Sequence, residues 1–291
     1  MNVQLEEDYR LVRLSNGAHS LRSLSHQETF HPVIGPKAEA EALYVNQLRI
    51  AQRALDSMQE FTIWDVGLGA AANALQAIRA VSNNRLEARL VSFDCTLSAL
   101  HFALKHKDEL DYLKDFEDVI QKLLEQHKVT FHSGKSTIYW ETHLADFPSL
   151  MESKIQLPTP HVIMFDAYSP AKNPAMWTLS NFSNIRSHCH PDQPCSLATY
   201  SRSTLLRSTL LLAGFYVGSG SATGEKEETT IAANSLSLIE RPLDHRWLQR
   251  AFRSTSAEPL STPVYVQKPL SVESREKLLK HPQFNQELCH G

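Results

Sequence analysis

The segment VIMFDAYSPAKNPAMWT, residues 162–178, places an acid directly after a run of apolar residues and then continues into a rigid polar loop. Asp166 ends the apolar run, and Pro170 and Pro174 restrict the backbone that follows it. Trp177 adds a flat aromatic face. A carboxylate in this position can assist a proton transfer, but the same pattern also occurs at an ordinary strand exit.

The turn DVGLGAAAN, residues 65–73, is a second candidate. Gly67 and Gly69 lie where a strand is expected to pass into a helix, and glycine there lets the backbone approach a ligand closely, although such turns also serve packing alone. Asp94 ends the next predicted strand, where a carboxylate can accept hydrogen bonds from the two hydroxyls of a ribose. Asp65 would repel a pyrophosphate but suits the ammonium end of S-adenosylmethionine, so the turn is more typical of that cofactor's loop.

These residues need a sheet that brings the ends of several strands together. Buried strands are predicted over five segments, namely 61–67, 88–94, 161–166, 195–201 and 214–221. They alternate with segments of helical periodicity, which predicts a mostly parallel, doubly wound sheet covered on both faces. The carboxyl ends of such strands share one edge, so Asp65, Asp94 and Asp166 are expected there.

Two further segments flank this sheet. Asn16-Gly17 predicts a tight β-hairpin near the amino terminus, and apolar residues at helical spacing predict an amphipathic helix from Pro36 to Met58. Prolines accumulate after about residue 240, which indicates an irregular and helical extension that wraps the domain. We therefore expect a hairpin and helix extension at 1–60, a core at 61–240 and a carboxyl-terminal extension at 241–291.

Composition limits the compartment and the partners. No apolar run approaches the roughly 18 residues of a membrane span, and the amino terminus carries acids where a signal peptide carries basic residues. A cytoplasmic protein without a membrane partner is predicted. The net charge of −3 gives no global attraction to a phosphate backbone, so a nucleic acid would need a local basic patch.

The segment SHCHPDQPC is the most tempting metal site. It brings His188, Cys189, His190 and Cys195 close together in the chain. Their spacing fits no structural zinc pattern, so a polar connection is favoured and no metal is expected. The four cysteines of the chain are scattered, which suits reduced thiols.

The segment that begins at Asp166 resembles the methyltransferase domain of the MnmC family, which uses S-adenosylmethionine to methylate an aminomethyl group on the wobble uridine of certain tRNAs. The family block D-x-F-x-P-x-K-N-P-x-M-W is matched, with tyrosine replacing phenylalanine, by Asp166, Tyr168, Pro170, Lys172, Asn173, Pro174, Met176 and Trp177. The similarity extends over roughly residues 8–234, from ETFHPVIGPKAEAEALYV to LLRSTLLLAGFYV. Ala71 stands where the family has a third glycine, and Glu227 replaces an arginine.

The resemblance implies an α/β, Rossmann-like S-adenosylmethionine-dependent methyltransferase fold with an N-terminal β-hairpin extension and no oxidase domain. The implied reaction converts 5-aminomethyl(-2-thio)uridine to 5-methylaminomethyl(-2-thio)uridine at the wobble position of tRNA. Two alternatives remain open at this point. The acceptor could be a small-molecule or protein amine, or the chain could bind S-adenosylmethionine without catalysis.

The resemblance also implies roles for individual residues. The cofactor would be bound by Glu28, Asp65, Gly67, Gly69, Asn73, Asp94 and Asp146, with Asp94 on the ribose and Asp146 on the adenine amino group. The amine would be oriented by Asp166, and the uracil would stack on Tyr168. Alkylamines titrate near ~10 and carboxylates near ~4, so drawing off the proton of a bound amine suits Asp166 better than acting as a base in water. His31 is a lesser candidate for a base. Substrate contacts are expected from Lys172, Asn173, Arg202 and Lys226, and Arg207 is a further candidate for a basic surface.

Overall fold

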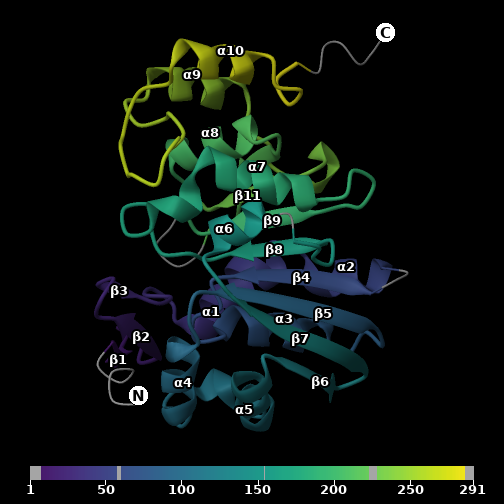
Figure 1. Ribbon diagram of the computed structural model, residues 1–291. Helices are drawn as coiled ribbons and strands as arrows, with labels where there is room; N and C mark the ends of the chain where they lie inside the picture. Colours follow the sequence, from purple (N-terminus) through teal and green to yellow (C-terminus); the bar gives the residue numbers. More distant parts are fainter. Residues whose placement is uncertain (1–7, 58–59, 154, 223–227, 286–291) are drawn as a thin grey trace.

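The computed structural model describes residues 8–57, 60–153, 155–222 and 228–285. Its strands form an eight-stranded sheet through the middle of the molecule and a separate three-stranded sheet beside it (Figure 1). The large sheet has the order β10-β11-β9-β8-β4-β5-β7-β6. Its strands are β4 (Phe61–Val66), β5 (Glu87–Asp94), β6 (Lys128–Ser133), β7 (Ser136–Leu144), β8 (Val162–Phe165), β9 (Ser196–Thr199), β10 (Tyr216–Ser219) and β11 (Thr230–Ala233).

The five central strands create the place where a ligand is expected. Strands β9, β8, β4, β5 and β7 are parallel, and β6, β11 and β10 pair antiparallel at the two edges. The chain leaves β4 towards β5 and β7, and it later returns to the other side of β4 with β8 and β9. In open α/β sheets ligands bind outside the carboxyl ends of the strands where the order reverses, which here is between β4 and β8. The predicted mostly parallel, Rossmann-like sheet is confirmed.

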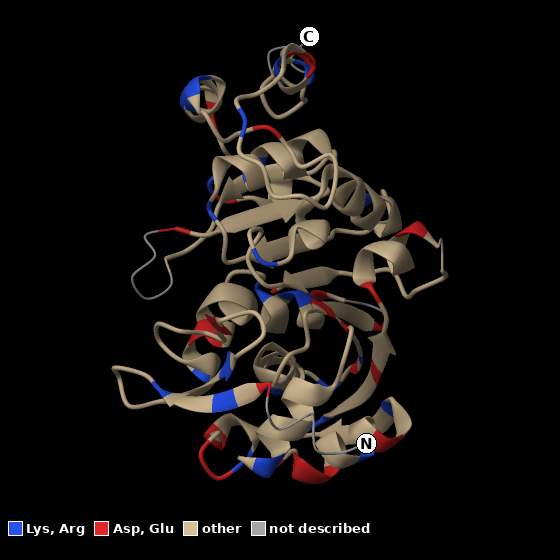
Figure 2. Cartoon of the chain, turned by 60° about the vertical axis from the view of Figure 1, so that its left-hand side comes forward, with Lys and Arg blue, Asp and Glu red and all other residues tan. Residues whose placement is uncertain are grey.

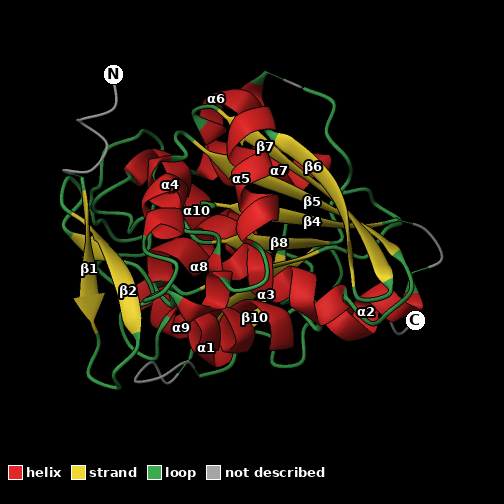
Figure 3. Cartoon of the chain, turned by 90° about the horizontal axis from the view of Figure 1, so that it is seen from below, coloured by secondary structure: helices red, strands yellow, loops and turns green. Residues whose placement is uncertain are grey.

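Helices lie on both sides of the large sheet (Figure 3), and alternate residues of β4 belong to two different cores. Phe61 and Ile63 join the first core, and Trp64 and Val66 join the second. The first core takes side chains from α2 (Ile50–Asp56), α3 (Ala72–Val81), α4 (Ser98–Lys105), η2 (Asp111–Leu113) and α5 (Glu117–Gln126). The second takes them from α6 (Phe147–Glu152), η3 (Pro174–Trp177), α7 (Leu179–His188), α8 (Thr204–Leu212), α9 (His245–Arg253) and α10 (Val272–Leu279). A short helix, η4 (Leu236–Leu238), follows β11.

The predicted continuous helix after Pro36 is wrong. Helix α1 (Pro36–Ala40) passes into a π-helical segment, η1 (Glu41–Asn46), and Arg49 adopts a left-handed conformation with φ 52° before α2 begins. Within η1 the side chain of Tyr44 is buried, and its hydroxyl donates to the carbonyl oxygen of Phe165 at 3.2 Å. A π-helical turn is frequent near functional sites and leaves no mark in a pattern of 3.6-residue periodicity.

The small sheet confirms the predicted amino-terminal hairpin. Its strands are β1 (Tyr9–Arg13), β2 (His19–Ser23) and β3 (Glu28–Thr29). The turn between β1 and β2 contains Gly17 at φ 87°, a backbone conformation that favours glycine. This sheet stands apart from the large one in Figure 3, next to the end at which the central strands finish.

The carboxyl-terminal extension is more helical than its proline content suggests. Helix α9 buries Trp247, Leu248 and Ala251 in the second core, and α10 buries Leu278 there. The extension therefore shares a core with the sheet instead of building its own. The division of the chain at residues 60 and 240 stays a prediction. Within the described residues, no helix is both long and apolar enough to cross a membrane.

Candidate active site

A cavity of about 560 Å³ lies at the carboxyl ends of β4, β5, β7 and β8, where the small sheet covers them. One side, which we call the turn wall, is formed by Gly67, Gly69, Asp94 and Asp146. A second part of the lining, which we call the loop wall, is formed by Glu28, His31, Asp166, Tyr168 and Ser169. Asn73 and Asn173 also line the cavity. The structure thus brings together most of the residues that the sequence singled out.

The turn after β4 depends on its glycines. Gly67 has φ 92°, and a Cβ atom there would lie 2.7 Å from the carbonyl oxygen of Asp166, so a side chain would push the two walls apart. Gly69 has φ 51°, and its amide donates to Oδ2 of Asp94 at 2.9 Å. Ala71, which replaces the third glycine of the family pattern, is buried at φ 63° and carries the strain of a left-handed non-glycine residue.

The carboxylate of Asp94 is fixed by backbone amides. Its Oδ2 accepts from Gly69, and its Oδ1 accepts from Cys95 at 2.8 Å and from Thr96 at 3.4 Å. Burial raises the pKa of Asp94, and these amides lower it. Oδ1 also accepts from the Cys95 thiol at 3.6 Å and is fully used, whereas Oδ2 accepts one hydrogen bond and keeps about one lone-pair site for a ligand. That capacity suits one ribose hydroxyl better than the expected two.

The structure does not place Asp65 at the cavity. Because side chains alternate along β4, Asp65 points into the first core, where it is fully buried and accepts a hydrogen bond from the Ser92 hydroxyl at 2.9 Å. Its Oδ1 has no hydrogen-bond partner among the described residues. The pKa of Asp65 is raised to about 7, mainly by burial; the hydrogen bond from Ser92 lowers it, and the charges of Asp166 and Asp94 add to the rise. The expected contact between Asp65 and the cofactor is therefore not part of our proposal.

Asp166 follows β8 directly and lies at the switch point between β4 and β8. Its Oδ2 accepts a hydrogen bond from Nδ2 of Asn73 at 2.7 Å, and Nε2 of His31 lies 3.7 Å from the same oxygen. His31 has φ 46°, a left-handed conformation that histidine adopts more often than most residues with a side chain. Asn73 is 3% exposed, and its Oδ1 has no hydrogen-bond partner among the described residues. The structure therefore presents an oriented carboxylate and, beside it, a buried acceptor that a ligand amine could satisfy.

Glu28 holds the loop that follows Asp166. Its carboxylate accepts hydrogen bonds from the amide of Ser169, at 3.1 Å, and from the Ser169 hydroxyl. Glu28 comes from β3 of the small sheet, so this contact ties the small sheet to the loop wall. Contact between Glu28 and the methionine end of the cofactor stays a prediction.

The ring of Tyr168 already has a partner. His26 stacks on it with the ring centroids 3.9 Å apart and the planes at 9°, and Phe30 lies 5.8 Å away at a tilt. Burial raises the pKa of the Tyr168 hydroxyl well above its ordinary value, with contributions from Tyr9 and Asp94. One face of the ring is therefore unavailable to a flipped uracil, which the sequence could not indicate.

Asp146 lies at the rim of the cavity and begins α6. Its Oδ2 accepts from the amide of Ser149 at 3.1 Å and from the Ser149 hydroxyl at 2.6 Å. Both hydrogen bonds use one oxygen and orient the carboxylate at the helix amino terminus. Contact between Asp146 and an adenine amino group stays a prediction.

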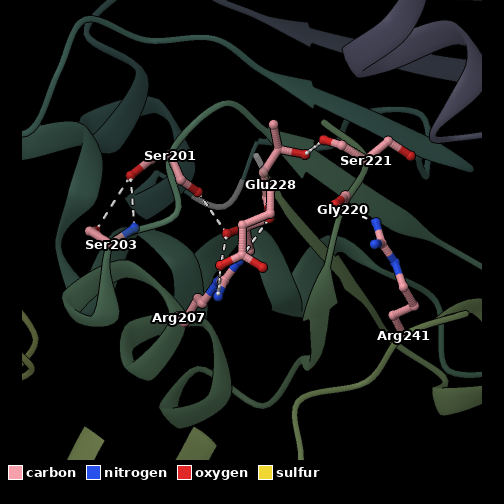
Figure 4. A network of polar contacts seen from close by, with 9 residues as sticks. Ser201, Ser203, Arg207, Gly220, Ser221, Glu228 and Arg241 are labelled. Carbon is pink, nitrogen blue, oxygen red and sulfur yellow. Dashed lines mark hydrogen bonds and ion pairs between the residues drawn. The ribbon is translucent and has the colours of Figure 1, made fainter. Parts of the chain in front are cut away.

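The predicted basic surface needs a correction at Arg207. This side chain is 3% exposed and paired internally, as Figure 4 shows: it donates to Glu228 at 3.0 Å, to the Thr230 hydroxyl at 3.1 Å and to the carbonyl of Thr229 at 2.8 Å. Arg207 is therefore a structural residue. Burial lowers its pKa and Glu228 raises it.

The other substrate candidates lie in different settings. Asn173 lines the cavity, and Lys172 is exposed beside it. Arg202 is exposed two residues after Tyr200, a cavity residue. Lys226 and the Glu227 substitution lie outside the described residues.

Several cavity residues were missed by the sequence reasoning. Tyr200 directly follows β9, and its hydroxyl donates to the carbonyl of Ala167 at 3.0 Å. Its position just past a strand end is the signal that identified Asp94 and Asp166, so it could have been found. Nothing in the local sequence marks Ser169 or His26.

The four candidate metal ligands around Cys189 lie in different settings. Cys189 and Cys195 are buried with their sulfur atoms 3.6 Å apart, while His190 is exposed. Within the part of the chain that the structure describes, no three His, Cys, Asp or Glu side chains are grouped to hold a metal ion.

Comparison with known proteins agrees with this geometry. Residues 111–235 match a family described as S-adenosyl-L-methionine-dependent methyltransferase. The bifunctional tRNA 5-methylaminomethyl-2-thiouridine biosynthesis protein MnmC of Leptospira interrogans is 26% identical over 146 residues, which are 49% of this chain and 21% of that protein. The protein of the same name from Aeromonas hydrophila is 26% identical over 215 residues, 66% of this chain and 30% of that protein. The chain thus spans less than a third of the length of these relatives.

The fold has a counterpart among solved structures. The crystal structure of MnmC2 from Aquifex aeolicus superposes with a TM-score of 0.69 at 22% identity and covers 94% of this chain and 84% of that one. Two observations now coincide: a Rossmann-like sheet with a glycine turn and an acidic strand end at its switch point, and a family match that includes the segment after Asp166. Residues 111–235 therefore match a family of S-adenosyl-L-methionine-dependent methyltransferases, and the chain as a whole resembles MnmC2 in fold.

Proposed function

We propose that the chain is an S-adenosylmethionine-dependent methyltransferase that acts on a primary amine, the aminomethyl group of a wobble uridine in tRNA. The observation that carries the proposal is the carboxylate of Asp166, which Asn73 holds at 2.7 Å inside the cavity at the switch point. The substrate class comes from the relatives, whose names place them in tRNA 5-methylaminomethyl-2-thiouridine biosynthesis.

The turn wall has the chemistry to hold S-adenosylmethionine. Gly67 and Gly69 let the backbone pass close to a ligand, Asp94 retains an acceptor site for a ribose hydroxyl, and Asp146 lies at the rim where an adenine amino group could donate. The free Oδ1 of Asn73 fits an ammonium donor. When bound, the cofactor supplies an electrophilic methyl group.

Asp166 would act on the acceptor nitrogen. As the amine gains a methyl group, positive charge develops on that nitrogen, and a carboxylate at hydrogen-bond distance stabilises the charge where it forms. Asn73 donates to Oδ2 of Asp166 and so keeps the carboxylate aimed into the cavity before the amine arrives. The proton that the new ammonium must lose can then pass to Asp166 or to solvent.

The loop wall is acidic, which suits a cationic product. Burial raises the pKa of Tyr200 well above its ordinary value, and Asp166, Glu28 and Glu39 raise it further because they place negative charge around the hydroxyl. The same field opposes phosphate. Only the modified base would therefore enter the cavity, and the RNA backbone would stay outside it.

A direct assay tests the proposal. We expect the purified chain to transfer labelled methyl groups from S-adenosylmethionine to tRNA that carries 5-aminomethyl-2-thiouridine and not to the same tRNA with unmodified uridine, with mass analysis of nucleosides locating the product. Methylation of free polyamines or of a protein amine without methylation of this tRNA would favour the alternative acceptor class, which the net charge of −3 makes the second candidate.

A further inference from the structure

Positive charge is concentrated in the carboxyl-terminal extension. Residues 241–285 contain eight Lys and Arg and four Asp and Glu, a net charge of +4 in a chain whose total is −3. Figure 2 shows Lys and Arg on the helices at the top of the molecule, where α9 and α10 lie. An acidic body with one basic end orients a polyanion before contact.

Within this extension, α9 carries a stripe of three arginines. Trp247, Leu248 and Ala251 bury one face of the helix in the second core. The exposed face carries Arg246, Arg250 and Arg253, which we call the arginine stripe. At 1.5 Å per residue their Cα atoms are about 6 Å and about 4.5 Å apart along the axis, and they lie within an arc of about 60°. The three guanidinium groups can therefore contact neighbouring phosphates of one strand.

One arginine of the stripe and a cation that follows β9 act on the same buried side chain. Tyr200 lines the cavity just past β9, and Arg202 follows two residues later. Burial is the main cause of the lowered pKa of Arg207, and Arg202 and Arg250 both add to it, so these two cations lie near the same buried side chain. Arg207 is neutralised internally by Glu228, whereas Arg250 is exposed. Exposed positive charge is thus present both on the segment that leaves the cavity, at Arg202, and on α9, at Arg250.

We propose that the arginine stripe of α9 binds the phosphate backbone of the RNA whose modified base occupies the cavity; this deepens the proposed function and rests on it for the identity of that RNA. Arginine favours this role because its planar guanidinium can bind a phosphate through two hydrogen bonds. The acidic loop wall repels phosphate, so a backbone site away from the cavity is needed to hold the substrate.

The test compares two triple variants of the full chain. Replacing Arg246, Arg250 and Arg253 with Glu reverses the stripe, and the control replaces Lys107, Lys122 and Lys128 with Glu. The control lysines are exposed and lie after α4, on α5 and on β6, at the other end of the molecule in Figure 1. Both variants change the net charge equally. Affinity for a tRNA transcript is measured by filter binding over a range of salt concentrations, with S-adenosylmethionine binding and a thermal melt as checks on the fold.

We expect the stripe variant to bind tRNA at least about tenfold more weakly and to lower the slope of log affinity against log salt by about 2 to 3, since each phosphate contact contributes about 0.7 to 0.9. The control should keep most of the affinity, and both should bind S-adenosylmethionine as the parent does. If the Glu variant unfolds at a lower temperature than the parent, a triple Arg→Gln variant replaces it. This variant adds no acids, and we expect it to lose tRNA affinity as well, but by a smaller factor.

Three results would overturn the inference: a parent chain that does not bind tRNA, a stripe variant that binds like the parent, or equal losses in both triple variants. Methylation of tRNA, measured separately from tRNA binding, tests the proposed function. If the parent binds tRNA through the stripe but methylates no tRNA, the inference stands and the proposed acceptor is wrong. If tRNA is methylated equally by parent and stripe variant with unchanged affinity, the acceptor stands and the inference is wrong.

Discussion

The two walls of the cavity are built in different ways. The turn wall is held by backbone: the glycines after β4 adopt left-handed conformations, and Asp94 is fixed by the amides of Gly69, Cys95 and Thr96. The loop wall is held by side chains from distant segments, since Asn73 fixes Asp166 and Glu28 fixes Ser169. Hydrogen bonds from the backbone survive most side-chain substitutions and are lost only when the backbone conformation changes. Hydrogen bonds between side chains can be removed by a single substitution. Cofactor binding and methyl transfer should therefore respond to different mutations.

Asp166→Asn is expected to give the largest difference between the effect on methyl transfer and the effect on cofactor binding. The amide is nearly isosteric, but it cannot stabilise the positive charge on the acceptor nitrogen or take its proton, so methyl transfer should fall by a factor of order 10² to 10⁴. S-adenosylmethionine affinity, measured by calorimetry, should stay within about twofold because the turn wall is unchanged. Raising the pH should recover part of the rate by supplying neutral amine.

Asp192→Asn, an exposed substitution in the loop before β9, is the matched control and should keep the parent rate. Turnover of the Asp166 variant at the parent rate near neutral pH would mean that this acid merely ends a strand.

Gly67→Ala should disturb the turn wall and the loop wall together, because residue 67 packs directly against the backbone of Asp166. The new Cβ would lie 2.7 Å from the Asp166 carbonyl oxygen at φ 92°, so the free energy of unfolding should fall by about 3 kcal/mol. Gly214→Ala is the control, because Gly214 has φ 89° but its nearest neighbouring atom would be 3.9 Å away. The free energy of unfolding of both variants, measured with urea, separates the cost of a positive φ for alanine from the cost of the contact between its Cβ and the Asp166 carbonyl oxygen. Equal losses would show that Gly67 is required for its φ alone.

Asp65→Asn should change the pH dependence of stability while leaving both walls intact. Burial raises the folded-state pKa of Asp65 from 3.8 to about 7. The folded chain then keeps a proton that the unfolded chain releases, so the stability from this group is complete below pH 3.8 and is lost as the pH rises to about 7.

The variant lacks this titration. Between about pH 5 and about pH 8, urea denaturation should show the parent losing on the order of 2 kcal/mol relative to Asp65→Asn. Parallel pH profiles for the two chains would contradict the assignment. We expect the variant to bind S-adenosylmethionine with unchanged affinity, because Asp65 is buried in the first core and does not line the cavity.

The smallest effect is expected from Glu28→Gln. The amide can still accept one hydrogen bond from Ser169 but loses the charge that strengthens both, a cost of about 1 kcal/mol. The KM for the RNA acceptor should rise about fivefold, while S-adenosylmethionine affinity stays constant. Ser169→Ala removes the hydroxyl hydrogen bond and keeps the one from the backbone amide, so the double variant should be little worse than Glu28→Gln alone. Additive losses would mean that Glu28 acts independently of Ser169.

The same contrast explains how far the sequence could predict the site. Asp94 and Asp166 were found because the end of a parallel strand is a local pattern with a fixed place in the fold. Asp65 was misplaced, since adjacent residues of a strand face opposite sides and its apolar neighbours do not reveal which core it enters. The π-helical segment and the stacking of His26 on Tyr168 depend on tertiary packing, which no local periodicity records. The roles of Glu28 and Tyr168 in the loop wall were expected from the resemblance to a known family and not from composition or periodicity.

The tie between Glu28 and Ser169 has a consequence for the order in which the domain assembles. These residues are 141 positions apart, whereas Gly69 and Asp94 are 25 apart. The entropy of closing a chain segment grows with the logarithm of its length, which makes the longer closure costlier by about 1.5 kcal/mol. This entropy must be lost before a long-range contact can stabilise the fold. We therefore expect the amino-terminal hairpin, although it is made first, to dock on the loop wall after Gly69 has met Asp94.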